Sequence, residues 1–363
     1  MKVYELEVAI KSPTLITFHS AGNILSHSGS YLPGSTVRGA LLGKIYEENP
    51  ERVKEEAENP TITFHPAYPV VEGEKSTPAH SLTYICKVCG RIFRSPLLDS
   101  RRKLGNLTVD RLEQPVKCPN NHYLAVKSIG GQPYTSIKGE MKVASLRYTV
   151  SHSTGINRAL RSSEIGLFYS YIAIAPGTRF KGLVADPEDK IPQLLGDTGN
   201  SVTVRIGRGS SRGLGKAAIK LKEKPDYLQR RAEIIEQVLR DTGNTLVLRA
   251  LSPTFTISMS ASGPATSPTP SINVKGIKPK PIHSSGKNYI LTGLTSISGY
   301  SKITNLPKIS VKAARQGSIY FYNVESPSET IYEEIARLEA LGTPPFNQLG
   351  LNILEVYGYE LPA

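Results

Sequence analysis

The sequence lacks several features that would assign the protein to a common functional class. No run of about 18 apolar residues occurs, so we expect no transmembrane helix. The opening residues, MKVYELEVAIKSP, alternate like a strand, so we predict no signal peptide. Three cysteines are too few for a disulfide scaffold in a chain of 363 residues. An HExxH motif is absent, and the carboxylates form no recognisable metal-binding set. We expect a soluble, cytoplasmic protein.

Acidic residues are in deficit. The chain has 31 Asp and Glu against 44 Lys and Arg, a formal net charge of +13, and a pI near 9.5. A hydrophobic content of 39% excludes a disordered tail protein. The charge favours a polyanionic partner, and nucleic acid ranks above a membrane surface because no basic amphipathic helix stands out. The alternative is a basic surface that serves only solubility.

The hydrophobic pattern predicts an alternation of strands and helices. Residues 3–8 alternate with period two, with Tyr4, Leu6 and Val8 on one face. After the Pro33-Gly34 turn, apolar residues at helical spacing predict a helix that Ser35 caps and that Asn49-Pro50 ends. Further helices are predicted at 191–195, 226–242 and 329–341, and strands near 61–71, 141–150, 166–175, 178–184, 202–206, 216–222, 245–258 and 317–324.

One unit occurs twice: a helix, a glycine-containing loop and a final strand, at 191–222 and at 329–360. An opening strand precedes each unit. The economical interpretation is an α+β fold of two tandem ferredoxin-like (RRM-like, β-α-β-β-α-β) domains. We place the N-terminal domain at 1–225, with an inserted cysteine-containing segment at about 72–130. The C-terminal domain is then 226–363, with a mobile, Ser/Pro/Thr-rich insertion at about 258–287.

The cysteines form the most specific local pattern. Cys86 and Cys89 make a CxxC knuckle, and Cys118 with His122 supplies a third thiolate and an imidazole. A Cys3His set is a standard tetrahedral zinc complement, and it leaves no open position for a catalytic water. We therefore predict a structural zinc that clamps the inserted segment. A redox CxxC, or one disulfide plus an odd thiol, remains the alternative.

The segment GRGSSRGLGK at 207–216 is the second pattern. Its four glycines allow a close backbone approach and exposed N–H groups, and its basic residues add charge. It does not match the P-loop, because Ala217 follows Lys216, nor a Rossmann fingerprint, because a strand pattern follows. Backbone phosphates of a nucleic acid match this loop better. A plain hairpin loop is the alternative.

Two further segments carry arginines suited to RNA. Arg38 lies in the first turn of the predicted helix, where it and the free N–H groups could share a phosphate. In RYTVSHSTGINRALRSSE, residues 147–164, arginines are interleaved with aromatic and amide side chains that could contact bases. An exposed arginine and a basic surface strand are the corresponding alternatives.

At this point the motifs resemble a known family. PGSTVRGALLGKIYE is similar to the helix start of the RAMP superfamily of CRISPR effector subunits, and GRGSSRGLGKAAI resembles its glycine-rich loop. The order of INRALRSSEIGLFY, APGTRFKGLV and AARQGSIYFY is similar to the Cas-five-like (Csx-ten type) subunit of type III-D complexes. The resemblance is scattered over most of the chain and strongest in 31–46 and 147–216.

The resemblance implies a non-catalytic subunit that grips the 5′ tag of a CRISPR RNA, caps the backbone of the complex and contacts the large polymerase-like subunit and the backbone RAMP subunits. The predicted RNA-binding residues are Ser35, Arg38, Gly39, Arg147, Asn157, Arg158, Gly207, Arg208, Gly209, Ser211, Arg212, Gly213 and Gly215. The second-domain loop, TPPFNQLGLN, has no Lys or Arg, which favours protein packing there.

Two other functions stay open. His19 and His27 lie in a polar segment after the first strand, where a general acid/base for RNA cleavage could act. The alternative function is therefore a metal-independent RAMP endoribonuclease that processes CRISPR precursor RNA. In such enzymes, however, the glycine-rich loop lies near the C-terminus. A zinc-stabilised module that binds anionic proteins is a more distant third.

Overall fold

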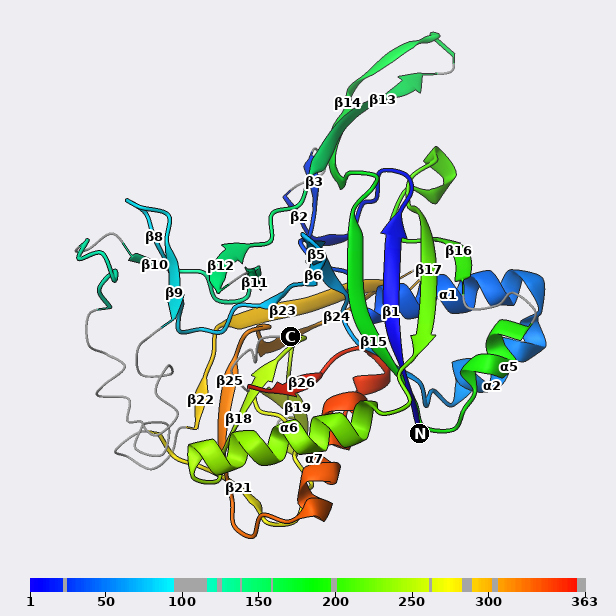
Figure 1. Ribbon diagram of the computed structural model, residues 1–363. Coiled ribbons are helices and arrows are strands. Elements are labelled where there is room, and N and C mark those ends of the chain that lie inside the picture. The colour runs from blue at the N-terminus through cyan, green and yellow to red at the C-terminus, as the bar shows by residue number, and fades with distance from the viewer. Residues whose placement is uncertain are drawn as a thin grey trace.

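The computed structural model describes residues 1–21, 25–94, 116–122, 126–137, 139–157, 159–196, 201–260, 263–282, 289–301 and 306–357 (Figure 1). These residues form a mixed α+β fold with two main sheets. No helix among them is long and apolar enough to span a bilayer.

The first sheet is built from the N-terminal part of the chain. Its order is β16 (Ser201–Arg205), β17 (Lys216–Glu223), β1 (Lys2–Ile10), β15 (Arg179–Asp186), β5 (Tyr68–Val71) and β6 (Glu74–Lys75), with β4 (Thr63–Phe64) on β15. The pairings of β1 with β15 and β17, and of β15 with β5, are antiparallel. Helices α1 (Gly34–Glu48) and α2 (Pro50–Glu58) follow β1, and α5 (Ile191–Leu195) follows β15. The elements β1, α1–α2, β5, β15, α5 and β17 follow the predicted β-α-β-β-α-β order, and β4, β6 and β16 are strands in addition to it.

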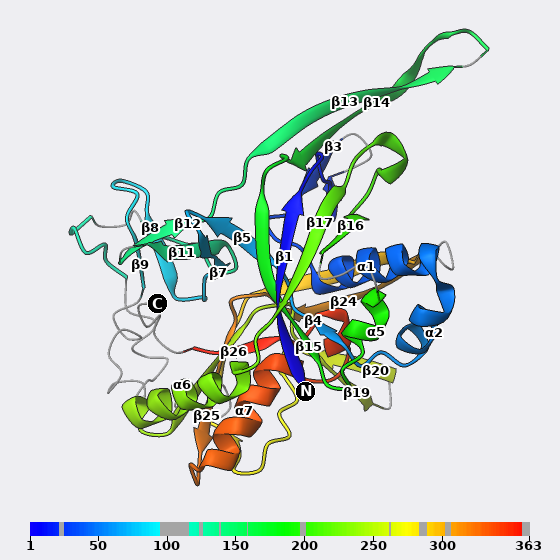
Figure 2. The ribbon, with the colours of Figure 1, turned by 45° about the vertical axis from the view of Figure 1, so that its right-hand side comes forward.

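Alternation along the strands decides which face of this sheet is buried. Tyr4, Leu6 and Val8 of β1 pack in one cluster with Val37 and Leu41 of α1. The opposite face carries charged side chains such as Glu5 and Glu7, except at one end, where Val3 and Ala185 pack against Ala340 of the C-terminal part. The three helices therefore cover one side of the sheet only (Figure 2).

The second sheet has the order β21 (Ile277–Pro279), β25 (Ile319–Val324), β18 (Thr245–Ala250) and β26 (Leu354–Val356), with β22 (Ile290–Leu291) on β25. Helix α6 (Tyr227–Thr242) packs against α7 (Glu329–Leu341). After β18 the chain forms the hairpin of β19 (Thr256–Ser260) and β20 (Gly263–Ser267), and the described part of 251–276 contains no helix. This unit therefore lacks one helix of the predicted pattern. The segment 258–287, predicted as a mobile insertion, supplies strands β20 and β21 in its described part.

Several smaller strands surround these sheets. The inserted segment holds the sheet of β10 (Val126–Ser128), β8 (Thr83–Cys86) and β9 (Ile92–Arg94). Its β7 (Thr77–Pro78) pairs beyond it with β11 (Pro133–Ile137), which pairs with β12 (Glu140–Val143). A separate sheet joins β13 (Tyr148–Asn157), β14 (Ser162–Ile174), β3 (Leu25–Ser28) and β2 (Thr17–Ala21). The hairpin of β13 and β14 projects far from the body (Figures 1 and 2). A second hairpin pairs β23 (Leu294–Ser301) with β24 (Leu306–Ala314).

One prediction on a helix start was wrong, and one helix was not predicted. Helix α1 begins at Gly34 with Pro33 at the N-cap, so Ser35 lies inside the helix and does not cap it. The sequence also gave no expectation of α2, which begins at Pro50 directly after Asn49. Proline is tolerated at the first helical position because its missing N–H has no partner there, so Asn49-Pro50 ends one helix and starts the next.

Candidate nucleic-acid interface and metal centre

The glycine-rich loop connects β16 to β17. Gly207, Gly209, Gly213 and Gly215 all have φ between 79° and 83°, a left-handed conformation that side-chain-bearing residues rarely adopt. At two of them a side chain is also excluded by contact: a Cβ would clash with the Leu15 carbonyl oxygen at Gly207 and with the Ile206 carbonyl oxygen at Gly215. The loop shape therefore requires glycine at these positions.

The loop presents side chains more than backbone amides. The N–H groups of Arg208, Arg212, Gly213, Leu214 and Gly215 all donate to backbone carbonyls, so they are not free for phosphates as the sequence suggested. One of these bonds, from Arg208 to the Leu15 carbonyl at 3.0 Å, fixes the loop to the segment after β1. Outward, the loop exposes two hydroxyls and two guanidinium groups: Ser210, Ser211, Arg208 and Arg212.

Arg212 packs against two tyrosines of β14. Its guanidinium carbon lies 5.2 Å from the ring centroid of Tyr169 and 5.9 Å from that of Tyr171, and Nη1 donates to the Tyr171 hydroxyl. The two rings lie 5.4 Å apart at 65°. Side chains at i and i+2 share one face of a strand, so both tyrosines point toward the loop. The YSY pattern at 169–171 could have predicted this pair, but sequence reasoning missed it.

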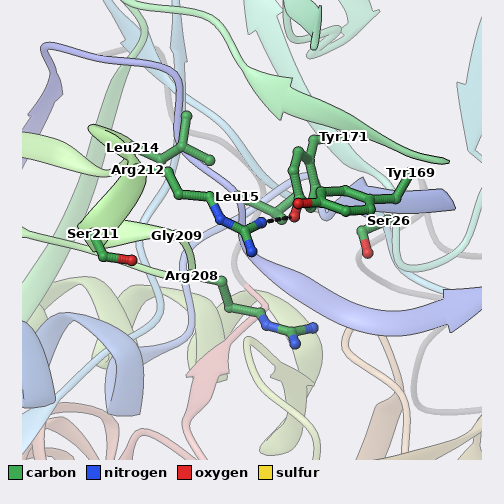
Figure 3. Close-up of a pocket in the computed structure, with 9 residues that line it drawn as sticks. All are labelled: Leu15, Ser26, Tyr169, Tyr171, Arg208, Gly209, Ser211, Arg212 and Leu214. Atoms are coloured by element: carbon green, nitrogen blue, oxygen red, sulfur yellow. Dashed lines mark hydrogen bonds between the residues drawn. The ribbon is translucent and has the colours of Figure 1, made fainter. Parts of the chain in front are cut away.

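Together these residues line a pocket of about 390 Å³. Its walls are the glycine-rich loop, the two tyrosines, one residue of the segment after β1 and one residue of β3. The lining residues are Leu15, Ser26, Tyr169, Tyr171, Arg208, Gly209, Ser211, Arg212 and Leu214. Figure 3 shows the Arg212 guanidinium beside the tyrosine rings, with its bond to Tyr171, and the Arg208 side chain further along the pocket wall. Two cations, two aromatic rings and two hydroxyls thus converge, without a histidine or carboxylate in the lining.

The helix-start residues lie elsewhere. Ser35 and Gly39 are exposed on α1, and neither lines the pocket. Arg38 is only 12% exposed, and its Nη2 donates to the Glu56 backbone oxygen at 2.7 Å and to Glu56 Oε1 at 3.1 Å. Glu56, 1% exposed, also accepts from the Thr61 N–H. The guanidinium thus joins α1 to α2, and phosphate binding by these three residues stays a prediction.

The residues predicted on the projecting hairpin are spread along it. Arg147 lies exposed at the base, and Asn157 ends β13 near the tip, where its Oδ1 accepts from the N–H groups of Ala159 and Leu160. Arg158 lies outside the described residues. The structure therefore brings the glycine-rich loop together with the middle of β14, and does not gather the predicted residues into one site.

The second glycine-containing loop packs inside the protein. A Cβ at Gly350 would clash with the Phe64 carbonyl oxygen and lie 2.7 Å from the Gly34 Cα at the start of α1. Thr63 of β4 donates to the Leu341 carbonyl at 3.2 Å. This loop therefore joins the C-terminal part of the chain to the first sheet.

The predicted zinc ligands do converge. One ligand atom each from Cys86, Cys89, Cys118 and His122 lies within 4.8 Å of the others. The Cys89 and Cys118 sulfurs are 3.7 Å apart, and Cys86 Sγ is 3.5 Å from His122 Nδ1. Zinc bond lengths of about 2.3 Å to sulfur and about 2.0–2.1 Å to nitrogen give tetrahedral edges of about 3.8 and 3.6 Å. The residues present therefore fit a tetrahedral metal ion.

The two pairs of ligands in the cluster lie on two similar backbone turns. The Gly90 N–H donates to the Cys86 carbonyl at 2.9 Å, and the Asn121 N–H to the Cys118 carbonyl at 2.8 Å. The backbone N–H of Cys89 lowers the pKa of the Cys86 thiol to about 6, with the N–H of Val88 acting in the same direction against burial. A thiolate is the form that binds metal. All three cysteines are free thiols, so the disulfide alternative does not match this structure.

The histidines of the nuclease alternative give no paired acid and base among the described side chains. His27 is exposed, and its ring lies 5.0 Å from that of Tyr148. The His19 side chain lies outside the described residues. His65 and His80 are buried, and burial is the main cause that lowers the pKa of each.

The comparisons with known proteins bear on the fold. No protein-family model and no curated protein matches the chain. A chain of the type III-B Cmr-beta complex bound to cognate target RNA is 14% identical, with a TM-score of 0.51 over 96% of each chain. A chain of that complex bound to target RNA and AMPPnP is 14% identical, with a TM-score of 0.48 over 92% of this chain and 88% of that chain. The CRISPR associated protein Cas6 is 11% identical, with a TM-score of 0.36 over 98% of this chain and 99% of that chain.

The likeness with the TM-score of 0.51 spans both chains almost completely. It shows that this chain shares the α+β fold of that Cmr-beta chain. It does not support the assignment to type III-D, which stays a prediction from the motifs.

Proposed function

We propose that this protein is an RNA-binding subunit of a type III CRISPR effector complex and performs no chemical step itself. The pocket between the glycine-rich loop and β14 is the observation that carries the proposal. Arg208 and Arg212 supply the charge that phosphates need, and Tyr169 and Tyr171 supply aromatic faces for bases.

The RNA we propose is the CRISPR RNA, held through its 5′ tag. This assignment depends on the resemblance of 31–46 and 147–216 to the Cas-five-like subunits, and it is consistent with the fold shared with a Cmr-beta chain. In this role the protein caps the backbone of the complex and contacts the polymerase-like subunit and the backbone RAMP subunits. The projecting hairpin supports binding of a single strand, because His152 and Phe168 expose rings stacked 5.6 Å apart along it.

We further propose that the cysteine cluster holds a structural zinc ion. Four protein ligands complete a tetrahedral shell, so the ion would have no position for a reacting water. Its function would be to join the turn after β8 to residues 116–122. These two parts lie far apart in the sequence, since Cys89 and Cys118 are separated by 29 positions.

The test is binding and cleavage measured on the same samples. Purified protein with EDTA and labelled CRISPR repeat RNA would be analysed on one native and one denaturing gel. We expect a shifted band and intact RNA. Discrete cleavage without metal would overturn the non-catalytic proposal and favour the processing endoribonuclease, and His19→Ala and His27→Ala would then identify its acid or base. A shift that is absent at every protein concentration would contradict RNA binding by the isolated subunit.

A further inference from the structure

The open face of the first sheet carries an excess of positive charge that the pocket does not use. It is the part of the face opposite α1, α2 and α5 that α7 leaves uncovered, since Val3 and Ala185 at one end pack against Ala340. Its side chains come from β1, β15, β16 and β17. Seven basic side chains lie there with two carboxylates, a net charge of +5: Arg179, Lys181, Arg205, Lys216, Lys220, Lys222 and Lys224, with Glu5 and Glu7.

The carboxylates compensate one side of this face. Glu7 pairs with Arg179 at 3.8 Å, and Glu5 pairs with Lys181 at 3.7 Å and with Lys224 at 3.2 Å. The uncompensated charge is therefore concentrated on the other side, along β17.

Three lysines make up that row. Lys216, Lys220 and Lys222 are exposed, and none forms an ion pair with another described residue, although Glu7 and Glu5 are the register neighbours of Lys220 and Lys222. Alternate residues of a strand share one face, so these three even-numbered lysines form a straight row along β17. From Lys216 to Lys222 the row is about 20 Å long, at about 3.3 Å per residue.

The row is continuous with the pocket. Lys216 follows Gly215 directly, and Arg205, its register partner on β16, precedes the loop on the other side. In Figure 1, β17 runs from this loop at the top of the sheet to the end near the N-terminus. A strand of RNA that leaves the pocket would meet the lysines in the order of the sequence.

The chemistry of the row favours phosphates over bases. The other side chains of β16 and β17 on this face are Ser201, Thr203 and Ala218, so no aromatic ring is available to stack a base there. Lysines offer flexible point charges, which suit successive phosphates of a backbone. We propose that the row Lys216–Lys220–Lys222 binds the phosphodiester backbone of the RNA strand where it leaves the pocket. This inference rests on the proposed RNA binding.

The test compares short and long RNA. Affinity of the full chain would be measured by fluorescence anisotropy with single strands of about 4 and about 16 nucleotides, the range that single-strand-binding modules cover. The variant is Lys220→Gln with Lys222→Gln, and the matched control is Lys54→Gln with Lys275→Gln, two exposed lysines outside this face.

We expect the row variant to leave the short RNA unaffected and to weaken the long RNA. Each lost phosphate contact reduces the slope of log K against log salt by about 0.7, so two lysines remove about 1.4, or roughly tenfold in affinity at 0.15 M salt. Equal slopes for the wild type and the variant would overturn the proposal. The proposal would also be overturned if the row variant bound RNA like the wild type but no longer bound a protein subunit of the complex. That outcome would identify the row as a protein interface.

Failure of the proposed function gives a different result. In that case neither RNA binds the wild type, and Arg212→Ala has no effect either. If Arg212→Ala weakens binding while the row variant does not, the pocket is correct and the row is not an RNA contact.

Discussion

Tyr169 allows the pocket to be tested without a change of charge. The substitution Tyr169→Ala removes the ring nearest to the Arg212 guanidinium and leaves the cations of the loop in place. Stacking of one base on an aromatic side chain contributes about 1–3 kcal/mol by alanine substitution. We therefore expect RNA affinity to fall about 5- to 150-fold, with the salt slope unchanged because no phosphate contact is lost.

Arg212→Ala should have the complementary signature. It removes one cation from the pocket, so we expect weaker binding with a slope shallower by about 0.7. Arg212→Lys keeps the charge and should keep the slope. It loses the planar group that lies against both rings and donates to the Tyr171 hydroxyl, so part of the affinity should still be lost.

The assay is anisotropy over a salt series, with 2-aminopurine in the RNA as a reporter of stacking. The chain contains no tryptophan, so the reporter is observed without indole emission. Tyr46→Ala is the matched control, since Tyr46 is 58% exposed on α1 and does not line the pocket. If Tyr169→Ala binds like this control, or changes the slope as Arg212→Ala does, the assignment of bases to the tyrosines is refuted.

Three further predictions concern the rest of the molecule. Metal analysis should find one zinc ion per chain in the wild type and none in Cys89→Ser. Chelation should increase hydrogen exchange around the cluster and leave RNA affinity unchanged. A wild-type protein without bound metal would refute this site. Arg38→Ala should lower the free energy of unfolding by about 3 kcal/mol in a denaturant titration, because buried Glu56 loses its cation; unchanged stability with weaker RNA binding would favour the phosphate role instead. Burial lowers the pKa of His65 to about 4, so the folded form holds the neutral ring, and His65 by itself should lower stability by about 2 kcal/mol from about pH 7.5 to pH 5 as the unfolded chain takes up a proton. His65→Gln should abolish that part of the pH dependence, measured by urea unfolding at both pH values.

Much of the secondary structure could be predicted from the sequence. The helices predicted at 191–195, 226–242 and 329–341 are α5, α6 and α7, and Gly243 ends α6 in the left-handed conformation. These elements have strong local signals, namely apolar spacing, an N-cap or a terminal glycine. The second unit departs from the prediction after β18, where a polar hairpin replaces a helix, because the stretch after β18 has no 3.6-residue apolar repeat to stabilise one.

The candidate site was only partly predictable. The glycine-rich loop and the four predicted zinc ligands came from short sequence patterns, and the structure brings each set together. Tyr169 and Tyr171 were missed because their importance depends on Arg212, which is about 40 residues away in the chain. The carboxylate partner of Arg38 was missed for a similar reason, since Glu56 follows a helix break that the sequence marked as an end.

By itself, the sequence determined the features that a few neighbouring residues encode: the alternating face of β1, the left-handed glycines at 207–215, the cysteine spacing and the net charge. Only the tertiary structure decided which of the basic side chains are free and which are already paired. That choice depends on strand register and helix packing, where Glu5 and Glu7 pair with Lys181 and Arg179 while the lysines of β17 form no ion pair with a described residue. Electrostatic pairing acts over a few ångströms in space, and the sequence does not specify which distant residues come that close.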